Sequence, residues 1–430
     1  MRNVESIRRN KPYQKKNSAA KTVSQLAALS GTPYSAMVEI ADRCNEACVH
    51  CYQVQGQKGE LDTEQWKRIF RELAEMGVLF LTISGGEPTL RKDFIELVAF
   101  ARQLRFAVKI YSNALNITPA LAAELGRLAV HEVQISLYSH LARVHDSVTR
   151  VPGSFDRVVA ATTHLRRVGV KVLLKTPLLS FNSSDFREYV DFVQSLDAEY
   201  ALDPTLNPRE DGSLEPTKFG IRKRDYFAVR RDGRMARLAG TAPKPIRSDA
   251  ERMPCGACRG SVHVEPNGEL RPCTLWNVPT GSALNGVKEA WHNDATATAI
   301  RSLTWKDLPD CSVCDLKRYC QRCFADAEQY AGNALAPYAQ ACRVARWQYE
   351  LVHGVEPEID RDADSCAVMP VGPFRATGSH RFSVAGDDPP SARRGIQGHE
   401  VLSAGTSRAA PQCAISPQLL QIRRHRSRSP

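Results

Sequence analysis

Six short apolar runs alternate with stretches of helical periodicity between residue 35 and about residue 203. This alternation is typical of βα units, in which consecutive strands pair in parallel and helices cover the sheet. Six units over about 170 residues are too few for a closed eight-unit barrel, which needs about 250. We therefore expect an α/β fold with a partial (β/α)6 barrel of the TIM type. The expected strands are residues 35–41, 78–83, 107–111, 132–137, 171–176 and 199–202, and the expected helices are 63–75, 93–104, 119–128, 155–168 and 185–196.

Polar and reactive residues gather where the expected strands end. In a parallel barrel these ends open on one face, where active sites are built. Turns also need small polar residues, which explains Ser112 and Asn113 but neither the cysteines after the first strand nor the double glycine after the second. We therefore expect the functional site on this face. In strand order it would hold the loop 44–51, residues 84–88, Ser112 with Asn113, Ser136 with Tyr138, Thr176, and Asp203.

The formal net charge of +11 is concentrated at the two ends of the chain. Residues 1–21 hold seven Lys or Arg against one Glu, and residues 422–430 hold four Arg and no acid, so the remaining chain is close to neutral. This favours solvated basic ends, with weak contact to an acidic partner or RNA as the alternative. No run approaches the roughly 20 apolar residues of a membrane helix, and no secretory signal is present. We expect a cytoplasmic protein that binds neither nucleic acid nor membrane.

The thirteen cysteines argue against a disulfide framework, because their number is odd and the chain has no export signal. Three of them, Cys44, Cys48 and Cys51, lie within eight residues. Structural zinc and [4Fe–4S] clusters both normally take four protein ligands. Three cysteines on one loop would leave one iron open to a substrate or cofactor, and His50 is badly placed to be the fourth ligand.

The spacing of these three cysteines resembles the CxxxCxφC signature of the radical S-adenosylmethionine (SAM) superfamily, with His50 at the usually aromatic position. The 85–88 segment, Gly-Gly-Glu-Pro, resembles the family's GGE motif. The resemblance implies reductive cleavage of SAM to a 5′-deoxyadenosyl radical that abstracts hydrogen from a substrate. It also implies residues that contact the cofactor. For those outside the GGEP segment, an ordinary role at a strand end or on the surface is the alternative. The expected cofactor-binding residues are Gly85, Gly86, Glu87 and Pro88, whose GGE backbone would contact the methionine amino group, Ser112 and Asn113 at the ribose, and Ser136 and Arg150 at the methionine carboxylate.

A second group of cysteines resembles the SPASM domain, a C-terminal extension of some radical SAM enzymes. The family pattern is matched over residues 255–342 with one departure, since two residues rather than three separate Cys320 and Cys323. Eight thiolates suit two auxiliary [4Fe–4S] clusters, and structural zinc or one incomplete cluster are alternatives. By analogy with the family, one cluster would take Cys255, Cys258, Cys273 and Cys323, and the other Cys311, Cys314, Cys320 and Cys342.

The chain is therefore expected to contain a barrel followed by a small cysteine-rich α+β domain. One further helix is expected at 221–238, and Cys366 and Cys413 are expected to be free thiols. The expected divisions are a basic arm at 1–34, the radical SAM barrel at 35–205, a bridge at 206–250, the SPASM domain at 251–352 and a disordered tail at 353–430.

The SPASM resemblance implies a peptide or protein side chain as substrate. Thr274 follows Cys273 where sulfatase-maturing enzymes carry an Asp base, which disfavours that reaction. The first 34 residues are too short for a fused leader-binding module, so we expect leader recognition by a separate leader-binding protein or by other surfaces. We also expect a flavodoxin or ferredoxin as reductant. Asp203 is a weak candidate for a catalytic group, because a turn residue before Pro204 is the alternative interpretation. Tyr138 is more simply interpreted as an aromatic residue of the core or at the end of a strand. The alternatives are a haem-like or other cofactor-biosynthesis enzyme, and a non-catalytic iron–sulfur carrier or scaffold, which would need no open iron.

Overall fold

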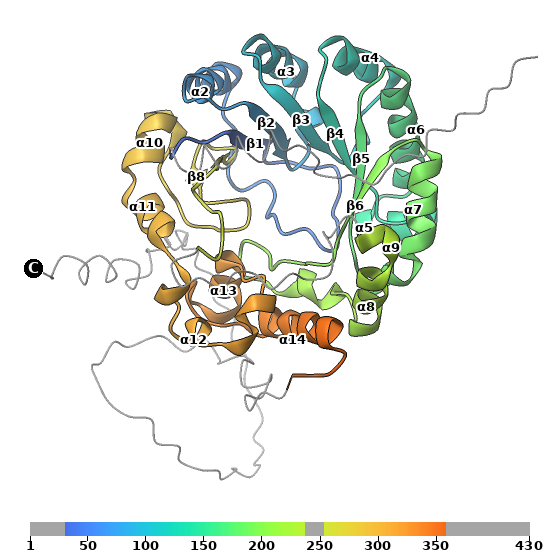
Figure 1. Ribbon diagram of the computed structural model, residues 1–430. Coiled ribbons are helices and arrows are strands. Elements are labelled where there is room, and N and C mark those ends of the chain that lie inside the picture. The colour runs from blue at the N-terminus through green and yellow to red at the C-terminus, as the bar shows by residue number, and fades with distance from the viewer. Residues whose placement is uncertain (1–30, 237–252, 358–430) are drawn as a thin grey trace, which may run out of the picture.

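A single eight-stranded sheet organises the computed structural model, which describes residues 31–236 and 253–357. Its first six strands are parallel and lie in chain order, so the expected partial (β/α)6 barrel is confirmed (Figure 1). These strands are β1 (Ser35–Ala41), β2 (Phe80–Gly85), β3 (Ala107–Ser112), β4 (Glu132–Ser136), β5 (Val172–Pro177) and β6 (Glu199–Asp203).

The cysteine-rich region continues the same sheet. Strand β7 (Ser261–Val264) pairs in parallel with β1, and β8 (Leu270–Arg271) pairs antiparallel with β7. The edge of β1 that an isolated six-stranded sheet would leave open is thereby paired. Sequence periodicity could not reveal this pairing, because it joins residues more than two hundred positions apart.

Helices cover the outer side of the curved sheet, and they begin and end within two residues of the expected positions. Helix α2 (Thr63–Glu75) has the expected bounds and starts with a capping box between Asp62 and Gln65. Its buried Trp66 and Phe70 belong to the main hydrophobic core together with Val38 of β1. The other outer helices are α3 (Phe94–Gln103), α4 (Pro119–Arg127), α6 (Ser154–Arg167) and α7 (Phe186–Ser195).

Several further elements complete the described chain. Helix α5 (Ala142–Thr149), between β4 and α6, was not expected from the sequence, and the helix expected at 221–238 is α8 (Lys223–Arg231) followed by α9 (Gly233–Ala236). The C-terminal helices α12, α13 and α14 lie in the part of the ring that the strands leave open (Figure 1). The remaining elements are α10 (Val287–Asn293), α11 (Ala295–Ser302), α12 (Pro309–Ser312), α13 (Phe324–Ala331), α14 (Ala339–His353) and the 3-10 turns η1 (Pro88–Leu90), η2 (Ser183–Asp185), η3 (Glu215–Phe219), η4 (Ala283–Asn285), η5 (Trp305–Asp307) and η6 (Asp315–Tyr319).

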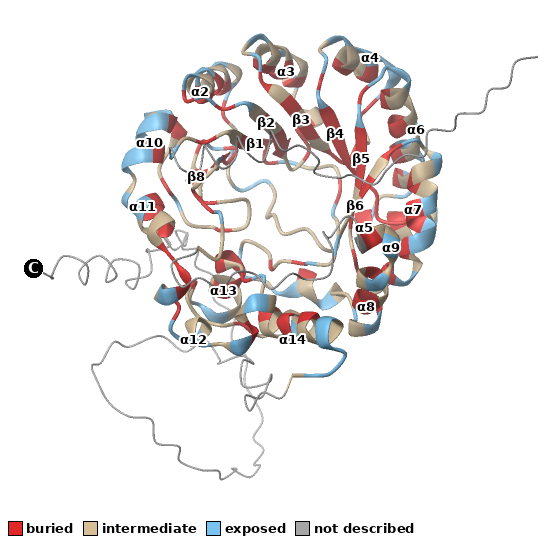
Figure 2. Cartoon of the chain, viewed as in Figure 1, coloured by how far each residue is buried: buried red, intermediate tan, exposed pale blue. Residues whose placement is uncertain are grey.

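The two faces of the strands differ in chemistry. Buried residues concentrate on the strands and on the helix faces turned toward them (Figure 2). Val38, Ile40 and Ile83 belong to the core beneath the outer helices. Successive side chains of a strand point to opposite faces, so the residues between them lie on the concave side. This concave row includes Glu39 on β1, Lys175 on β5 and other polar residues, which makes the inside of the partial barrel polar.

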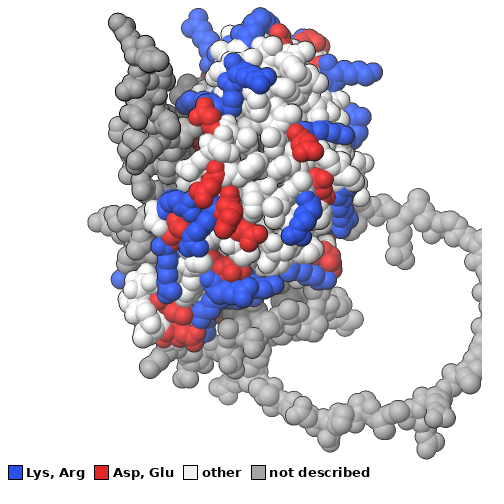
Figure 3. All heavy atoms as spheres, turned by 90° about the vertical axis from the view of Figure 1, so that its right-hand side faces the viewer, with Lys and Arg blue, Asp and Glu red and all other residues white. Residues whose placement is uncertain are grey.

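On the face drawn in Figure 3, basic and acidic side chains are interspersed, which agrees with a nearly neutral body. None of the helices in the described ranges is long and apolar enough to cross a membrane. The basic ends, the spare thiols Cys366 and Cys413, most of the expected N-terminal arm and most of the expected tail lie outside the described residues.

Candidate active site at the carboxyl ends of the strands

The loop after β1 carries the first three cysteines. All three are half-buried free thiols, and Cys51 interacts electrostatically with both Cys44 and Cys48. Burial raises the pKa of Cys44 to about 12 and raises the pKa of Cys48 and Cys51 as well. Buried thiols of this kind give up their protons when a metal centre supplies compensating positive charge. The donor set is therefore suited to a metal cluster.

Helix α5, which the sequence did not predict, holds this loop in place. The backbone N–H of Ala47 donates to the carbonyl of Thr149 at 3.1 Å, and that of Val49 donates to Val148 at 3.0 Å. His145, Val148 and Thr149 are buried at helical spacing, which is the signal that could have revealed the helix.

The two glycines after β2 pack against the start of the cysteine loop. The N–H of Gly86 donates to Ala41 at 2.7 Å, and the N–H of Glu87 donates to Arg43 at 2.8 Å. A Cβ at Gly85 would lie 2.4 Å from the Ala41 carbonyl oxygen, and one at Gly86 would lie 2.3 Å from that of Arg43. Gly85 also has φ +136°, which side chains rarely adopt. These contacts give the double glycine a structural role, because the absence of side chains allows the loop to sit beside β2.

Glu87 connects the end of β2 to the end of β3. Its fully buried carboxylate accepts hydrogen bonds from Thr89 N, Thr89 Oγ1, Ser112 Oγ and Asn113 N at 2.6–3.1 Å. Burial raises the pKa of Glu87, and these hydrogen bonds act in the opposite direction. The carboxylate therefore fixes the relative positions of the GGEP segment and the 112–113 segment.

Asn113 reaches the cysteine loop directly. Its Nδ2 donates to Asn45 Oδ1 at 2.7 Å and lies 3.6 Å from Cys44 Sγ. Ser136 interacts with the phenol of Tyr138 at the end of β4. Arg150 is exposed and ends α5 in the left-handed conformation, directly after the residues that hold the loop. The structure thus brings Asn113 to the thiols, while the SAM contacts expected of Ser112, Asn113, Ser136 and Arg150 stay predictions.

Tyr138 and His50 form an aromatic wall beside Cys48. The phenol oxygen of Tyr138 lies 3.6 Å from Cys48 Sγ, and its ring meets the His50 ring edge-on at 4.8 Å. His145 Nδ1 accepts a hydrogen bond from the backbone of Tyr138 at 3.1 Å and stacks on its ring. Burial lowers the pKa of His50 to about 4, which keeps the ring neutral. The wall limits access of water to this side of the loop.

Asp203 acts locally in a turn. It is exposed at the end of β6, and its Oδ1 accepts a hydrogen bond from Thr205 N at 2.8 Å. Lys175, which the sequence analysis missed, lies on the concave side with its ammonium 3.4 Å from the centre of the Tyr111 ring. Burial lowers the pKa of Lys175 to about 8, with Glu132 and Asp203 opposing the shift.

The remaining eight cysteines form two neighbouring sets. The Cys273 thiol interacts electrostatically with Cys255 and Cys258. Cys323, directly before helix α13, interacts with Cys255 and Cys273. Cys320 interacts instead with Cys311, Cys314 and Cys342. Burial raises the pKa of the thiols at Cys255, Cys258, Cys273, Cys311, Cys320 and Cys323.

Arg322 lies between the two sets and carried no signal in the sequence. It is 5% exposed, and its Nη2 donates to the carbonyls of Ala334 and Ala336, each at 2.6 Å. Its guanidinium lies 5.0 Å from the centre of the Phe324 ring. At Cys255 and Cys311 burial raises the thiol pKa, and the positive charge of Arg322 partly offsets this.

Comparison with known proteins agrees with this geometry. The profile of the Radical SAM superfamily matches residues 38–193. Mycofactocin maturase MftC of Mycobacterium tuberculosis (strain CDC 1551 / Oshkosh) is 44% identical over 290 residues, covering 61% of this chain and 71% of that protein. The chain belongs to the radical SAM superfamily.

More distant radical SAM relatives cover a larger share of the chain. PqqA peptide cyclase of Rhodopseudomonas palustris is 25% identical over 72% of this chain and 87% of its own, and AdoMet-dependent heme synthase of Methanosarcina barkeri is 24% identical over 72% and 96%. The crystal structure of Streptococcus suis SuiB bound to S-adenosylmethionine has the same fold, with a TM-score of 0.55 and 19% identity over 74% of this chain and 79% of that one.

A radical SAM enzyme uses SAM and an iron–sulfur cluster. The loop with the three cysteines packs closely against Gly86, and a substitution there tests this contact. We expect Gly86→Ala to destabilise the protein by about 1–3 kcal/mol, because the methyl group would overlap the Arg43 carbonyl. Denaturant unfolding of the metal-free protein measures this. The matched control is Gly233→Ala, since no atom lies within 4 Å of a Cβ there and its φ is ordinary. Equal stability of the two variants would contradict the packing argument.

Glu87→Gln tests the carboxylate separately. The amide group would face N–H and O–H donors and leave at least one of them unpaired, so we expect a loss of about 1–3 kcal/mol. Glu124→Gln is the control, because Glu124 is paired only with Arg127 on the surface of α4, where such pairs contribute about 0–1 kcal/mol. The same unfolding measurement compares them.

Proposed function

We propose that this radical SAM enzyme modifies a ribosomally synthesised peptide and that Cys44, Cys48 and Cys51 ligate its catalytic cluster. The observation that carries the proposal is the buried three-thiol loop joined to the GGEP segment, in a chain 44% identical to a mycofactocin maturase. When bound, the [4Fe–4S] cluster and SAM supply a 5′-deoxyadenosyl radical able to abstract hydrogen from an unactivated carbon.

The chain's own residues position and shield this chemistry. Gly85 and Gly86 let the cysteine loop lie against β2, and Glu87 fixes the strand ends on which the cofactor-binding residues lie. Tyr138 and His50 lie against Cys48 and would shield this side of a bound cluster from water. The proposed cofactor contacts remain those of the GGEP segment, Ser112, Asn113, Ser136 and Arg150.

A peptide substrate is favoured over a small cofactor precursor by two features. The second cysteine region has the SPASM pattern, whose members mostly act on peptides. PqqA peptide cyclase, by its name, acts on a peptide, and it covers the same share of the chain as the heme synthase. We further propose a flavodoxin- or ferredoxin-type reductant, a separate leader-binding protein, and a cytoplasmic location in which the free thiols stay reduced.

Two auxiliary [4Fe–4S] clusters are part of the proposal. Cys255, Cys258, Cys273 and Cys323 would ligate one, and Cys311, Cys314, Cys320 and Cys342 the other. The electrostatic contacts within each set support this division, and a complete set of four thiols leaves no iron open.

Anaerobic reconstitution tests the cluster assignment. We expect about 12 irons per chain, as three four-iron clusters require, and release of 5′-deoxyadenosine after reduction with dithionite in the presence of SAM. Cys44→Ala, Cys48→Ala and Cys51→Ala should each abolish this release and lose about four irons. The control Cys366→Ala should retain both the release of 5′-deoxyadenosine and the full iron content. Release of 5′-deoxyadenosine by all three loop variants would exclude the assignment.

The substrate requires its own measurement. Short peptides encoded beside the gene should change mass when incubated with the reconstituted enzyme, SAM and reductant. Cys44→Ala should leave the same peptides unchanged. Turnover of a porphyrin precursor without any change in these peptides would instead support the cofactor-biosynthesis alternative.

The position of Arg322 leads to a prediction about the midpoint potentials of the auxiliary clusters. A buried positive charge stabilises the more negative, reduced state of a neighbouring cluster, so Arg322→Gln should lower the midpoint potential of at least one auxiliary cluster. A shift of about 100 mV is expected for a unit charge several Å away at an effective dielectric constant of about 20. Arg231→Gln is the control, because Arg231 also lies 5.0 Å from a phenylalanine ring but is exposed on α8. Redox titration followed by electron paramagnetic resonance (EPR) gives the midpoint potentials of the two auxiliary clusters in each variant. Unchanged potentials in Arg322→Gln would contradict the prediction.

A further inference from the structure

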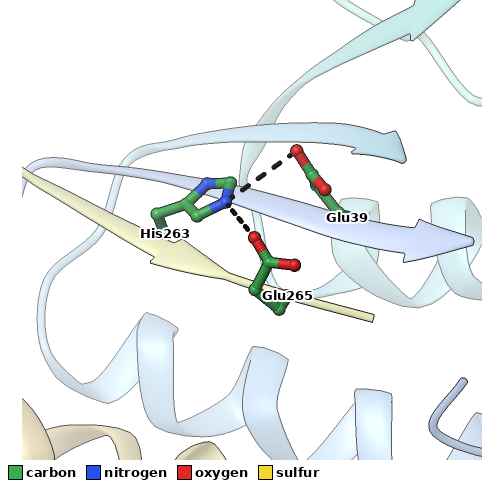
Figure 4. A group of neighbouring side chains, drawn as sticks. All are labelled: Glu39, His263 and Glu265. Atoms are coloured by element: carbon green, nitrogen blue, oxygen red, sulfur yellow. Dashed lines mark hydrogen bonds and ion pairs between the residues drawn. The ribbon is translucent and has the colours of Figure 1, made fainter. Parts of the chain in front are cut away.

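Three ionisable side chains that the proposed chemistry does not use meet on the concave side of the sheet. Glu39 of β1, His263 of β7 and Glu265 directly after β7 point toward one another (Figure 4). His263 Nε2 lies 3.8 Å from Glu39 Oε1 and 3.3 Å from Glu265 Oε1. All three residues are at most 4% exposed. The register explains their meeting, because β1 and β7 are paired neighbours in the sheet.

Each carboxylate uses one oxygen for a neighbour and turns the other toward the group. Glu39 Oε2 accepts a hydrogen bond from Gln53 at 2.9 Å, and Glu265 Oε2 is paired with the Lys58 ammonium at 2.5 Å. Glu39 Oε1, His263 Nε2 and one Glu265 oxygen lie within 4.8 Å of one another, and Glu39 Oε1 has no hydrogen-bond partner. Neighbours that orient ligand residues in this way are typical of metal sites.

The charge of this group is incompletely balanced. Lys58 is shared between Glu265 and Glu210, and Glu39 is a third carboxylate close to them. Buried carboxylates whose charge is incompletely compensated are costly. Burial raises the pKa of Glu39 to about 7, and the charges of Glu265 and Glu210 add to the rise while His263 and Lys58 oppose it. A divalent cation would supply compensating positive charge.

We propose that Glu39, His263 and Glu265 form a binding site for a divalent transition-metal cation, separate from the thiol-ligated iron. Two carboxylates and one imidazole suit Mn²⁺, Fe²⁺ or Zn²⁺, and the nitrogen ligand disfavours Mg²⁺ and Ca²⁺. The site borders the catalytic loop, because Gln53, which orients Glu39, follows Cys51 by two residues. Its ligands come from both the first strand of the barrel and the cysteine-rich region, so a bound cation would also join these two parts.

Mn²⁺ is a suitable probe, because it prefers oxygen and nitrogen ligands and competes poorly for thiolates. The holoenzyme, with its clusters filled and oxidised, is titrated with Mn²⁺ while EPR follows the free ion. We expect one Mn²⁺ per chain, displaced by Zn²⁺. Glu39→Gln and His263→Ala should each weaken binding at least tenfold. Glu132→Gln is the matched control, since Glu132 is also a buried strand carboxylate, bonded to Gln134 and lying outside the group.

Iron content and circular dichroism establish that each variant is folded and loaded. A second measurement needs no variant, because pulsed EPR of Mn²⁺ bound to the wild-type enzyme should show coupling to an imidazole nitrogen. Failure of the wild type to bind Mn²⁺ would overturn the proposal. So would bound Mn²⁺ without nitrogen coupling, or equal affinities in Glu39→Gln, His263→Ala and Glu132→Gln.

Discussion

The contact between the double glycine and the start of the cysteine loop is the constraint on which the candidate site depends. Gly86 and Glu87 donate backbone hydrogen bonds to the carbonyls of Ala41 and Arg43. A Cβ on Gly85 or Gly86 would overlap these same carbonyl groups. The loop therefore leaves β1 at a fixed height and direction. Glu87, one residue further on, carries the same alignment to β3 through Ser112 and Asn113. Three strand ends are thus set relative to one another by contacts within the chain.

Much of the barrel could be predicted, because each of its elements carries a local pattern. Trp66 and Phe70 recur at helical spacing in α2, and its expected bounds were right. Helix α5 was missed because its eight residues show helical spacing only once, at His145, Val148 and Thr149, and this brief signal is easily overlooked. Strand β7 was missed for another reason. Its partner is β1, far away in sequence, and no local pattern reports a pairing of that kind.

The candidate site divides in the same way. The cysteines and the GGEP segment are recognisable because their spacing is fixed along the chain. Arg322, Lys175 and His263 are single polar residues. Each has a neighbour from a distant segment, namely Cys255, Tyr111 and Glu39, which only the folded chain brings close. Cys323 makes the point within one motif. It stands three residues from Cys320, yet its thiol neighbours are Cys255 and Cys273, at least fifty residues earlier.

Strand β1 is where these contributions meet. Val38 and Ile40 pack into the core under α2, so the strand is held by the hydrophobic effect on its outer face. Glu39, between them, must then face inward, where the polar interior and the neighbouring strand β7 supply its partners. The same alternation on β5 turns Lys175 inward toward Tyr111. The concave surface therefore carries the Lys175 ammonium on the β5 side and the Glu39 and Glu265 carboxylates on the β1 and β7 side, so its polar groups follow from the core packing on the opposite face.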